Sequence, residues 1–381
     1  MTKQDNNQAL ETNDSRVLVI VAAGTGGHVM PGLAVARVMR ARGWKIEWIG
    51  TTTGMEGGLV AREEIPFHPL NFQGVRGKGL SGAILGLLKM VKAIWQSRSI
   101  LKKIRPDLVF STGGYVAVPV GFAAQSIKRP IVLMNCDADI LMSTNTLMPF
   151  TDALACGFAG GARTFAGPKG HTTGNPVRAE IAAVPAPEER FAGREGPLKL
   201  FVFGGSLGAQ VLNDVIPEAL ALIPEEKRPV VLHQTGRNRD KEVREHYEKL
   251  GVKAEVVPFI DDMAARYRES DLVICRSGAT SCSELCAAGA AAVLVPFIAK
   301  TTRHQLGNAR YLADRGAAVL VEQSGFTAEK AAELIGGMTR EKALGIAKAA
   351  RAIAAPDAAG KVADLIEQTL AARIAAAAAK K

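Results

Sequence analysis

The sequence predicts an α/β protein with two doubly wound domains and a cleft between them. Apolar strand-like runs alternate with helix-like stretches, and unbroken Val/Ile/Leu runs are typical of parallel strands covered on both faces. The order of apolar run, glycine-rich turn and helix occurs twice, starting at Val17 and at Leu198. A length of 381 residues also favours two domains over one.

The strand-like runs fall in both halves of the chain. They cover 17–22, 45–49, 108–111 and 130–134 in the first half, and 198–203, 229–233, 254–257, 271–275 and 291–296 in the second. Composition shifts to Gly, Pro, Ala and Arg between about 160 and 196, where we expect the linker.

The expected domain organisation follows from these runs. We expect a disordered lead-in over 1–15, a first domain over 16–172, a second domain over 173–352, and an alanine-rich helix over 353–381 that returns to the first domain.

Composition narrows the class of protein. Hydrophobic residues make up 48% and charged residues 22%, which excludes a mostly disordered chain. No apolar stretch approaches the length of a spanning helix, and the polar first fifteen residues do not resemble a secretory signal. The five cysteines show no metal-binding spacing, and their odd number favours reduced thiols in cytoplasm.

The net charge of +10 calls for an anionic partner, either nucleic acid or an anionic membrane surface. Between Arg76 and Arg105 there are eight basic residues and no acidic one. Bulky apolar residues recur there at helical spacing: Ile84, Leu87, Leu88, Val91, Ile94 and Trp95. Two interpretations stay open, an interfacial membrane-binding helix or a core-facing helix with a solvated basic face. Nucleic acid is disfavoured because aromatic residues make up only 5% of the chain and the basic segments are not interleaved with stacking groups.

The glycine-rich turns of the first half suit phosphate. Between a buried strand and a helix, such a turn points backbone N–H groups at open space, on the positive end of the helix dipole. The first turn covers 24–28 and ends in His28, which can bind a phosphate or act as a base on a hydroxyl. The second turn covers 111–115 and includes Gly114 and Tyr115. Tight strand–helix packing alone also explains such turns, and Tyr115 also fits an ordinary half-buried aromatic.

The second half carries three further polar segments. The glycine loop at 204–209 has neither a lysine after the glycines nor dinucleotide-binding spacing. The small-residue turn at 276–284 offers amides to a phosphate, and Glu284 can accept from both hydroxyls of a ribose or simply stabilise the helix start. The segment 304–309 presents imidazole and amide groups that suit sugar hydroxyls.

These segments together resemble one known family. GTGGHVMPGLAVA, STGGYVAVP, TGNPVR, FVFGGSLGAQVLN, FIDDMAARYRESDLVICRSGATSCSE and an HQxxNA run occur in the family's order over roughly residues 16 to 350. The family is that of the bacterial glycosyltransferases that form lipid II for peptidoglycan. The resemblance implies a GT-B fold and inverting transfer of N-acetylglucosamine from UDP-N-acetylglucosamine to lipid I. It also implies a peripheral position on the cytoplasmic face of the inner membrane, with cell-wall synthesis proteins as candidate partners.

The resemblance also assigns roles to matching positions. It implies acceptor contacts at Gly114 and Tyr115, and His28 is the candidate catalytic base. No cofactor is required, no metal ligands are identified, and divalent metal is optional. The implied donor contacts are Thr25, Gly26, Gly27, Arg178, Ser206, Ile260, Ala279, Thr280, Ser281, Cys282, Ser283, Glu284, His304, Gln305 and Asn308.

Four segments depart from the family pattern. Residues 133–137 read LMNCD where the family has a His-Glu-x-Asn run, which puts one substrate contact in doubt. Leu207 replaces a glutamine, Thr280 and Ser281 replace Leu-Thr, and no aspartate precedes His304.

Three other classes compete with a glycosyltransferase. A nicotinamide oxidoreductase should show a G-x-G-x-x-G turn, which neither half does. A UDP-sugar epimerase on the same fold would lack the basic lipid-facing helix. A non-catalytic nucleotide-sugar-binding module would bind donor without turnover.

Overall fold

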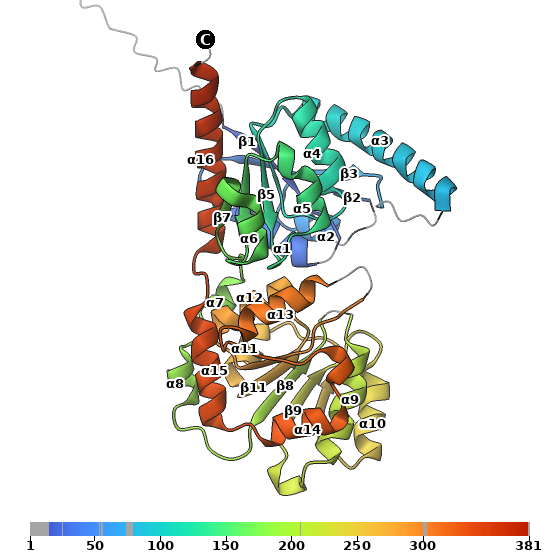
Figure 1. Cartoon of the computed structure of the whole chain (residues 1–381), viewed down its shortest axis with the longest axis vertical. Helices are drawn as coiled ribbons and strands as arrows, with labels where there is room; N and C mark the ends of the chain where they lie inside the picture. Colours follow the sequence, from blue (N-terminus) through green and yellow to red (C-terminus); the bar gives the residue numbers. More distant parts are fainter. Residues whose placement is uncertain are drawn as a thin grey trace, which may run out of the picture.

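The computed structural model describes residues 15–24, 26–52, 54, 56–73, 79–205, 207–299 and 303–379. The expected lead-in, except its last residue, lies outside this part of the chain, as do Thr25, Ser206, Arg76 and Lys78. The described residues form two parallel sheets, one above the other in Figure 1.

The first domain has one parallel sheet in the order β3-β2-β1-β4-β5-β6-β7. Strands β2 and β3 lie on one side of β1, whereas β4 to β7 lie on its other side. The strand order therefore reverses between β1 and β4. This reversal is where open α/β sheets bind ligands, at the carboxyl ends of the strands. Its elements are β1 (Val17–Val21), α1 (Gly26–Ala41), β2 (Lys45–Thr51), α2 (Glu56–Ala61), β3 (Phe67–Leu70), α3 (Gly79–Ile104), β4 (Leu108–Ser111), α4 (Ala117–Ser126), β5 (Ile131–Asn135), α5 (Met142–Leu147), β6 (Ala153–Cys156), α6 (Gly161–Ala166) and β7 (Gly170–Thr172).

The second domain repeats this plan with the order β10-β9-β8-β11-β12-β13. Its strand order reverses between β8 and β11, so it has a second switch point. Its elements are α7 (Ala179–Ala182), α8 (Pro187–Phe191), β8 (Lys199–Phe203), α9 (Gln210–Ala221), β9 (Val230–Gln234), α10 (Asp240–Lys249), β10 (Glu255–Val257), α11 (Met263–Glu269), β11 (Leu272–Cys275), α12 (Ala279–Ala288), β12 (Ala292–Leu294), α13 (His304–Ala313), β13 (Val319–Leu320), α14 (Ala328–Gly336) and α15 (Arg340–Ala352).

Successive residues of β1 explain why its sequence is uniformly apolar. Leu18 and Ile20 pack on the face covered by α1, whereas Val19 and Val21 pack on the face covered by α4. All four are fully buried, so each position of the strand faces a core.

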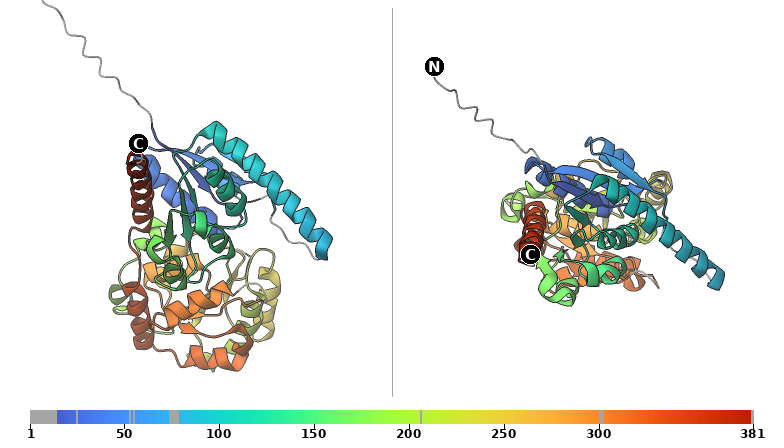
Figure 2. Two further views of the ribbon diagram at one scale, coloured as in Figure 1. Left: turned by 45° about the horizontal axis from the view of Figure 1, so that its top comes forward. Right: turned by 90° about the horizontal axis from the view of Figure 1, so that it is seen from above.

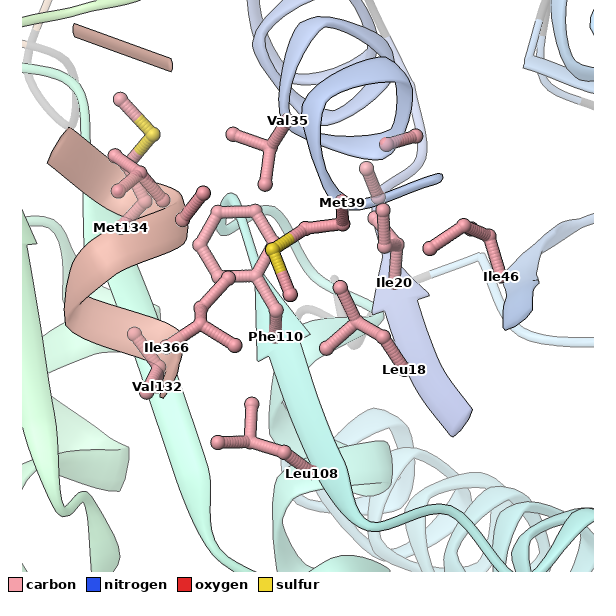
Figure 3. Close-up of a cluster of buried hydrophobic side chains, with 14 of the residues drawn as sticks. Leu18, Ile20, Val35, Met39, Ile46, Leu108, Phe110, Val132, Met134 and Ile366 are labelled. Atoms are coloured by element: carbon pink, nitrogen blue, oxygen red, sulfur yellow. The ribbon is translucent and has the colours of Figure 1, made fainter. Parts of the chain in front are cut away.

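The last helix, α16 (Ala358–Ala378), lies against the first domain although it follows the second in sequence (Figure 1). Ile366 joins the core beside Phe110 and Val132 (Figure 3). At the surface, Arg42, directly after α1, pairs with Asp364 at 2.8 Å and with Glu367 at 2.7 Å. The chain therefore crosses between the domains twice.

The two crossing segments touch each other. Gly174 has a φ of +79°, and a Cβ there would collide with the Cβ of Ala355 in the second crossing. A glycine is required at this point by both the backbone conformation and the lack of space.

Each predicted strand run overlaps a strand of the structure, but four strands of the described residues were not predicted: β3, β6, β7 and β13. They have two to four residues each, and β3 contains Pro69 at the edge of the sheet. Segments this short carry little periodicity of their own, and neighbouring strands supply the pairing that fixes them.

Candidate active site

His28 lies in the first turn of α1, at the carboxyl edge of the first sheet. Its Nδ1 is 2.9 Å from the carbonyl oxygen of Thr112, and the Thr112 hydroxyl donates to the carbonyl of His28 at 2.8 Å. A carbonyl only accepts, so Nδ1 carries the hydrogen and Nε2 of the neutral ring holds a lone pair. Burial lowers the pKa of His28, although the Thr112 contact and Asp137 oppose this shift. The ring is therefore neutral at pH 7, with Nε2 able to accept a proton.

A buried carboxylate that the sequence did not reveal holds the first turn in place. Glu56 is fully buried and accepts from the backbone N–H of Gly24 at 3.2 Å. It also accepts from the N–H and the hydroxyl of Thr51 at 2.7 and 2.6 Å. Gly24 has a φ of +100°, which favours glycine. Nothing in the local sequence of Glu56 distinguishes it from a surface glutamate.

The second glycine turn packs directly on His28. Gly113 and Gly114 have φ values of +98° and +82°, and Cβ atoms on them would lie 3.5 and 3.7 Å from the imidazole ring. Tyr115 is half-buried, with its ring 6.1 Å from that of Phe72. The structure thus brings both predicted turns of the first domain together at one edge of its sheet.

In the second domain, the predicted phosphate turn begins α12. The backbone N–H groups of Ala279, Thr280 and Ser281 occupy the first helical turn, where a helix supplies no acceptors of its own. Cys282 differs, because its thiol is fully buried and its N–H donates to Gly278 at 2.9 Å. The Ser283 hydroxyl donates to the carbonyl of Ala279 and accepts from Asn175 at 2.9 Å. A donor contact by the side chain of Cys282 would require it to leave the core.

Arg178 and Glu284 pair with each other. Both Nε and Nη2 of Arg178 lie 3.2 Å from Oε1 of Glu284, and the Tyr267 hydroxyl donates to Oε2 at 3.2 Å. Burial raises the pKa of Glu284, and the Arg178 guanidinium opposes that shift. A cation for phosphate and a carboxylate for hydroxyls therefore lie side by side beside the α12 amides.

Asn308 connects the two domains. Its Nδ2 donates to Asp137 at 2.7 Å and to the carbonyl of Ser277 at 3.0 Å, and its Oδ1 accepts from the N–H of Ala138 at 2.8 Å. The side chain is fully buried. A sugar contact by Asn308 would therefore require these bonds to break.

Gln305 and His304 remain partly accessible at the start of α13. Oε1 of Gln305 accepts from the N–H of Phe297 at 2.8 Å, which leaves its amide hydrogens to be directed elsewhere. A charge on His304 would oppose protonation of His28 and lower the pKa of that imidazole, although the two residues belong to different domains.

The glycine loop after β8 is braced by the neighbouring strands. Gln234 donates to the carbonyls of Gly205 and Pro258 at 3.1 and 3.0 Å. Gly208 has a φ of +73°, and a Cβ on it would collide with the carbonyl of Thr235. Leu207, which departs from the family pattern, is 81% exposed. Ile260 lies beyond β10 and borders a pocket of about 200 Å³.

Two arginine–aromatic pairs flank this edge and were not predicted. Arg276 lies over the ring of Phe297 at 5.6 Å, and Arg237 over Phe259 at 6.0 Å. Both phenylalanines are nearly half exposed. The sequence gives little indication of these pairs, because the arginine and the phenylalanine of each pair are far apart in the chain and meet only in the folded sheet.

A larger cavity than the pocket beside Ile260 lies elsewhere. A groove of about 620 Å³ is lined by Lys199, Arg228 and Val230, at the amino ends of β8 and β9. Open α/β sheets bind ligands at the opposite edge, so this cavity is not the candidate site. Among the residues that the structure describes, no cluster of His, Cys, Asp and Glu has the arrangement of a metal site.

Helix α3 exposes an apolar stripe. Leu87, Leu88 and Trp95 are 64%, 62% and 69% exposed, and Ile84 and Val91 lie on the same face. The core-facing alternative for this stripe is therefore wrong, and of the predicted set only Ile94 packs on the core. Lys89 and Lys92 of the same helix are also exposed. No helix within the described ranges is apolar over a length sufficient to cross a bilayer.

Two facing parallel-sheet domains, each with glycine turns at its carboxyl edge, are the architecture of nucleotide-sugar enzymes with the GT-B fold. The N-terminal domain of glycosyltransferase family 28 matches residues 18–155, and its C-terminal domain matches residues 199–369. A crystal structure of Acinetobacter baumannii MurG superposes with a TM-score of 0.79 at 33% identity, covering 93% of this chain and 99% of that one.

Two relatives are more similar to this chain in sequence than the Acinetobacter baumannii protein is. The UDP-N-acetylglucosamine–N-acetylmuramyl-(pentapeptide) pyrophosphoryl-undecaprenol N-acetylglucosamine transferase of Chromobacterium violaceum is 49% identical over 356 residues, 93% of this chain and 98% of that protein. The protein of the same name from Janthinobacterium sp. (strain Marseille) is 49% identical over 351 residues, 92% and 98% of the two chains. The chain belongs to this family of N-acetylglucosamine transferases.

Proposed function

We propose that the protein transfers N-acetylglucosamine from UDP-N-acetylglucosamine to undecaprenyl-pyrophosphoryl-N-acetylmuramyl-pentapeptide (lipid I), giving lipid II with inversion at the anomeric carbon. The observation that carries this proposal is the 49% identity, over nearly the full length of both chains, with transferases of that name. The paired loops at the edges of both sheets support it independently.

The donor binds mainly to the second domain. The amides at the start of α12 and the Arg178 guanidinium neutralise the pyrophosphate, while Glu284 accepts from the ribose hydroxyls. The backbone at Ile260 reads uracil, and Gln305 with His304 contacts the N-acetylglucosamine. Ser206 is assigned to the phosphates, and Thr25, Gly26 and Gly27 to the cleft near the transferred sugar.

The acceptor approaches the first domain, at Gly114 and Tyr115. Its sugar hydroxyl attacks the anomeric carbon, and the hydroxyl proton passes to Nε2 of His28. The bond from the anomeric carbon to the β-phosphate oxygen breaks, and its electron pair leaves with UDP. Fixed amides and Arg178 stabilise the charge that develops on the leaving group without needing to reorganise.

The α3 stripe binds an anionic membrane surface on the cytoplasmic face of the bacterial inner membrane. Exposed apolar side chains with flanking lysines have the character of an interfacial helix. The amino-terminal end of α3 stands away from the domain in both views of Figure 2, so the stripe can reach a flat surface. Docking there places residues 16–172 beside the lipid acceptor.

One assay tests the transfer. Labelled UDP-N-acetylglucosamine is incubated with a prenyl-pyrophosphoryl-N-acetylmuramyl-pentapeptide, and the label is expected in the lipid fraction. Label that appears only in free sugar would support an epimerase instead. Donor binding with no turnover would support a non-catalytic module.

A second assay tests the membrane contact. The Leu88→Gln/Trp95→Gln variant should bind vesicles containing anionic lipid at least about 30-fold more weakly, because burying two such side chains contributes about 2 kcal/mol or more. Leu222→Gln is the matched control, since Leu222 is 57% exposed on the second domain. Equal binding by all three proteins would show that α3 is not the membrane contact.

A further inference from the structure

A polar groove at the domain boundary is not used by the site described above. Its volume is about 540 Å³, and one wall is a single stripe of α13 and the residues flanking it: Arg303, Leu306, Gly307, Arg310, Tyr311, Asp314 and Arg315. These positions recur every three to four residues, so they share one face of the helix. The stripe spans about 18 Å at about 1.5 Å per residue.

The opposite wall belongs to the first domain. It consists of Ala138 and Asp139 after β5, and Gly160 and Gly161 before α6. Gly307 allows the two walls to approach, because a Cβ there would collide with the Asp139 carboxylate. The groove therefore forms only when the two domains face each other.

Three arginines give the groove its chemistry. The Arg315 guanidinium stacks 3.8 Å from the centre of the Tyr311 ring and donates to the Tyr311 carbonyl at 2.9 Å, which fixes its plane. Arg310 lies 3.6 Å from Glu322, an exposed pair of the weak kind that a ligand carboxylate can replace. Asp139 and Asp314 also line the groove and can accept N–H groups. Such a lining suits a ligand with several carboxylates and amides.

One end of the groove lies next to the candidate site, and the groove lies away from α3. Its α13 wall starts at Arg303, directly before His304, which the proposed function places on the N-acetylglucosamine. In the first domain, α6 lies at the β6–β7 end of the sheet, whereas α3 packs on α4 and β3. Figure 1 shows α13 beneath the first domain and α3 on the far side of that domain.

We propose that this groove binds the peptide carried by the muramyl sugar of the acceptor, with Arg310 and Arg315 on its carboxylates. The inference rests on the proposed function, because the relatives' name gives the acceptor a pentapeptide. Five extended residues span about 17 Å, close to the length of the α13 wall. The lipid then leaves the cleft on the α3 side and the peptide on the other.

The test compares two acceptors with the same short prenyl chain, pyrophosphate and muramyl sugar, one with the pentapeptide and one without it. The peptide-bearing acceptor should have a KM about 10-fold lower with the unaltered protein. The Arg310→Gln/Arg315→Gln variant should raise that KM about 10-fold, with kcat and the KM for the peptide-free acceptor within about 2-fold. Lys241→Gln/Lys249→Gln, at two exposed side chains of α10, is the charge-matched control.

A third acceptor, with its peptide carboxylates amidated, tests the same contact without altering the protein. It should behave like the peptide-free acceptor. Equal KM values for all three acceptors, or a variant that raises every KM alike, would overturn the inference. Transfer to none of them by the unaltered protein would instead refute the proposed function.

Discussion

Replacing Asn308 by alanine tests whether this side chain connects the domains or contacts the sugar. The substitution removes three hydrogen bonds, two of which join the domains. It also leaves the Asp137 carboxylate, only 7% exposed, without its amide donor. The loss should therefore appear in the stability of the domain contact.

The magnitude follows from the partners. A hydrogen bond to a buried carboxylate contributes about 1.5–3 kcal/mol, and each of the two neutral bonds about 1 kcal/mol. Their sum is about 4 kcal/mol. A domain of this size loses about 2–4 °C in Tm per kcal/mol, so Asn308→Ala should lower Tm by about 8 °C or more.

The assay combines thermal unfolding, hydrogen exchange at the Ala138 amide and steady-state kinetics. Asn308→Ala should unfold earlier and exchange faster at Ala138. Gln305→Ala is the contrast, because the Gln305 side chain makes one hydrogen bond to its own domain. It should raise the donor KM with a Tm change under about 2 °C. If Asn308→Ala instead keeps its Tm and its Ala138 protection while the donor KM rises, the bridging role is refuted.

Two further predictions concern histidines. Because burial lowers the pKa of His28 from its ordinary value of 6.5, the midpoint of the acid limb of kcat/KM should lie below pH 6.5. His28→Ala should remove this acid limb and lower kcat at least about 100-fold, with the UDP dissociation constant nearly unchanged; an equal loss of UDP binding would make His28 a donor contact. Burial lowers the pKa of His233 to about 3, so between pH 6.5 and 3 the unfolded chain binds the extra proton. Stability should therefore be full above pH 6.5 and fall toward pH 3, by at most about 1.4 kcal/mol per pH unit from this group, and urea midpoints of His233→Gln should show a shallower decline.

The architecture could be predicted from the sequence because the patterns that indicate strands and turns are local. A run such as Val17–Val21 is apolar at every position, and a glycine turn must follow it for the chain to enter α1. The short strands were missed because pairing with neighbours, rather than their own pattern, defines them. The direction of the α3 stripe was left open for a similar reason, since periodicity gives a face but not what covers it.

The candidate site was also predictable only in part. The two glycine turns of the first domain lie together because parallel strands bring their carboxyl ends to one edge. Glu56 and the partners of Asn308 were not predicted, because their contacts join residues far apart in the chain. For example, 171 positions separate Asp137 from Asn308. No motif encodes such a pair, and the fold alone brings it together.

Residues 133–137 depart most from the family pattern, and different side chains form the contacts of the loop that follows them. Asn135 donates to the carbonyls of Asp137 and Asp139 at 2.7 and 2.9 Å and accepts from the N–H of Leu141 at 3.0 Å. These local bonds fold the loop without a histidine or a glutamate, and they aim the Asp137 carboxylate at Asn308. A charge at position 137 therefore strengthens the contact with Asn308 and opposes the lowering of the pKa of His28. Asp137→Asn should therefore weaken the domain contact and also shift the acid limb of kcat/KM to lower pH. If the loop had only a structural role, the substitution would weaken the domain contact without shifting the acid limb.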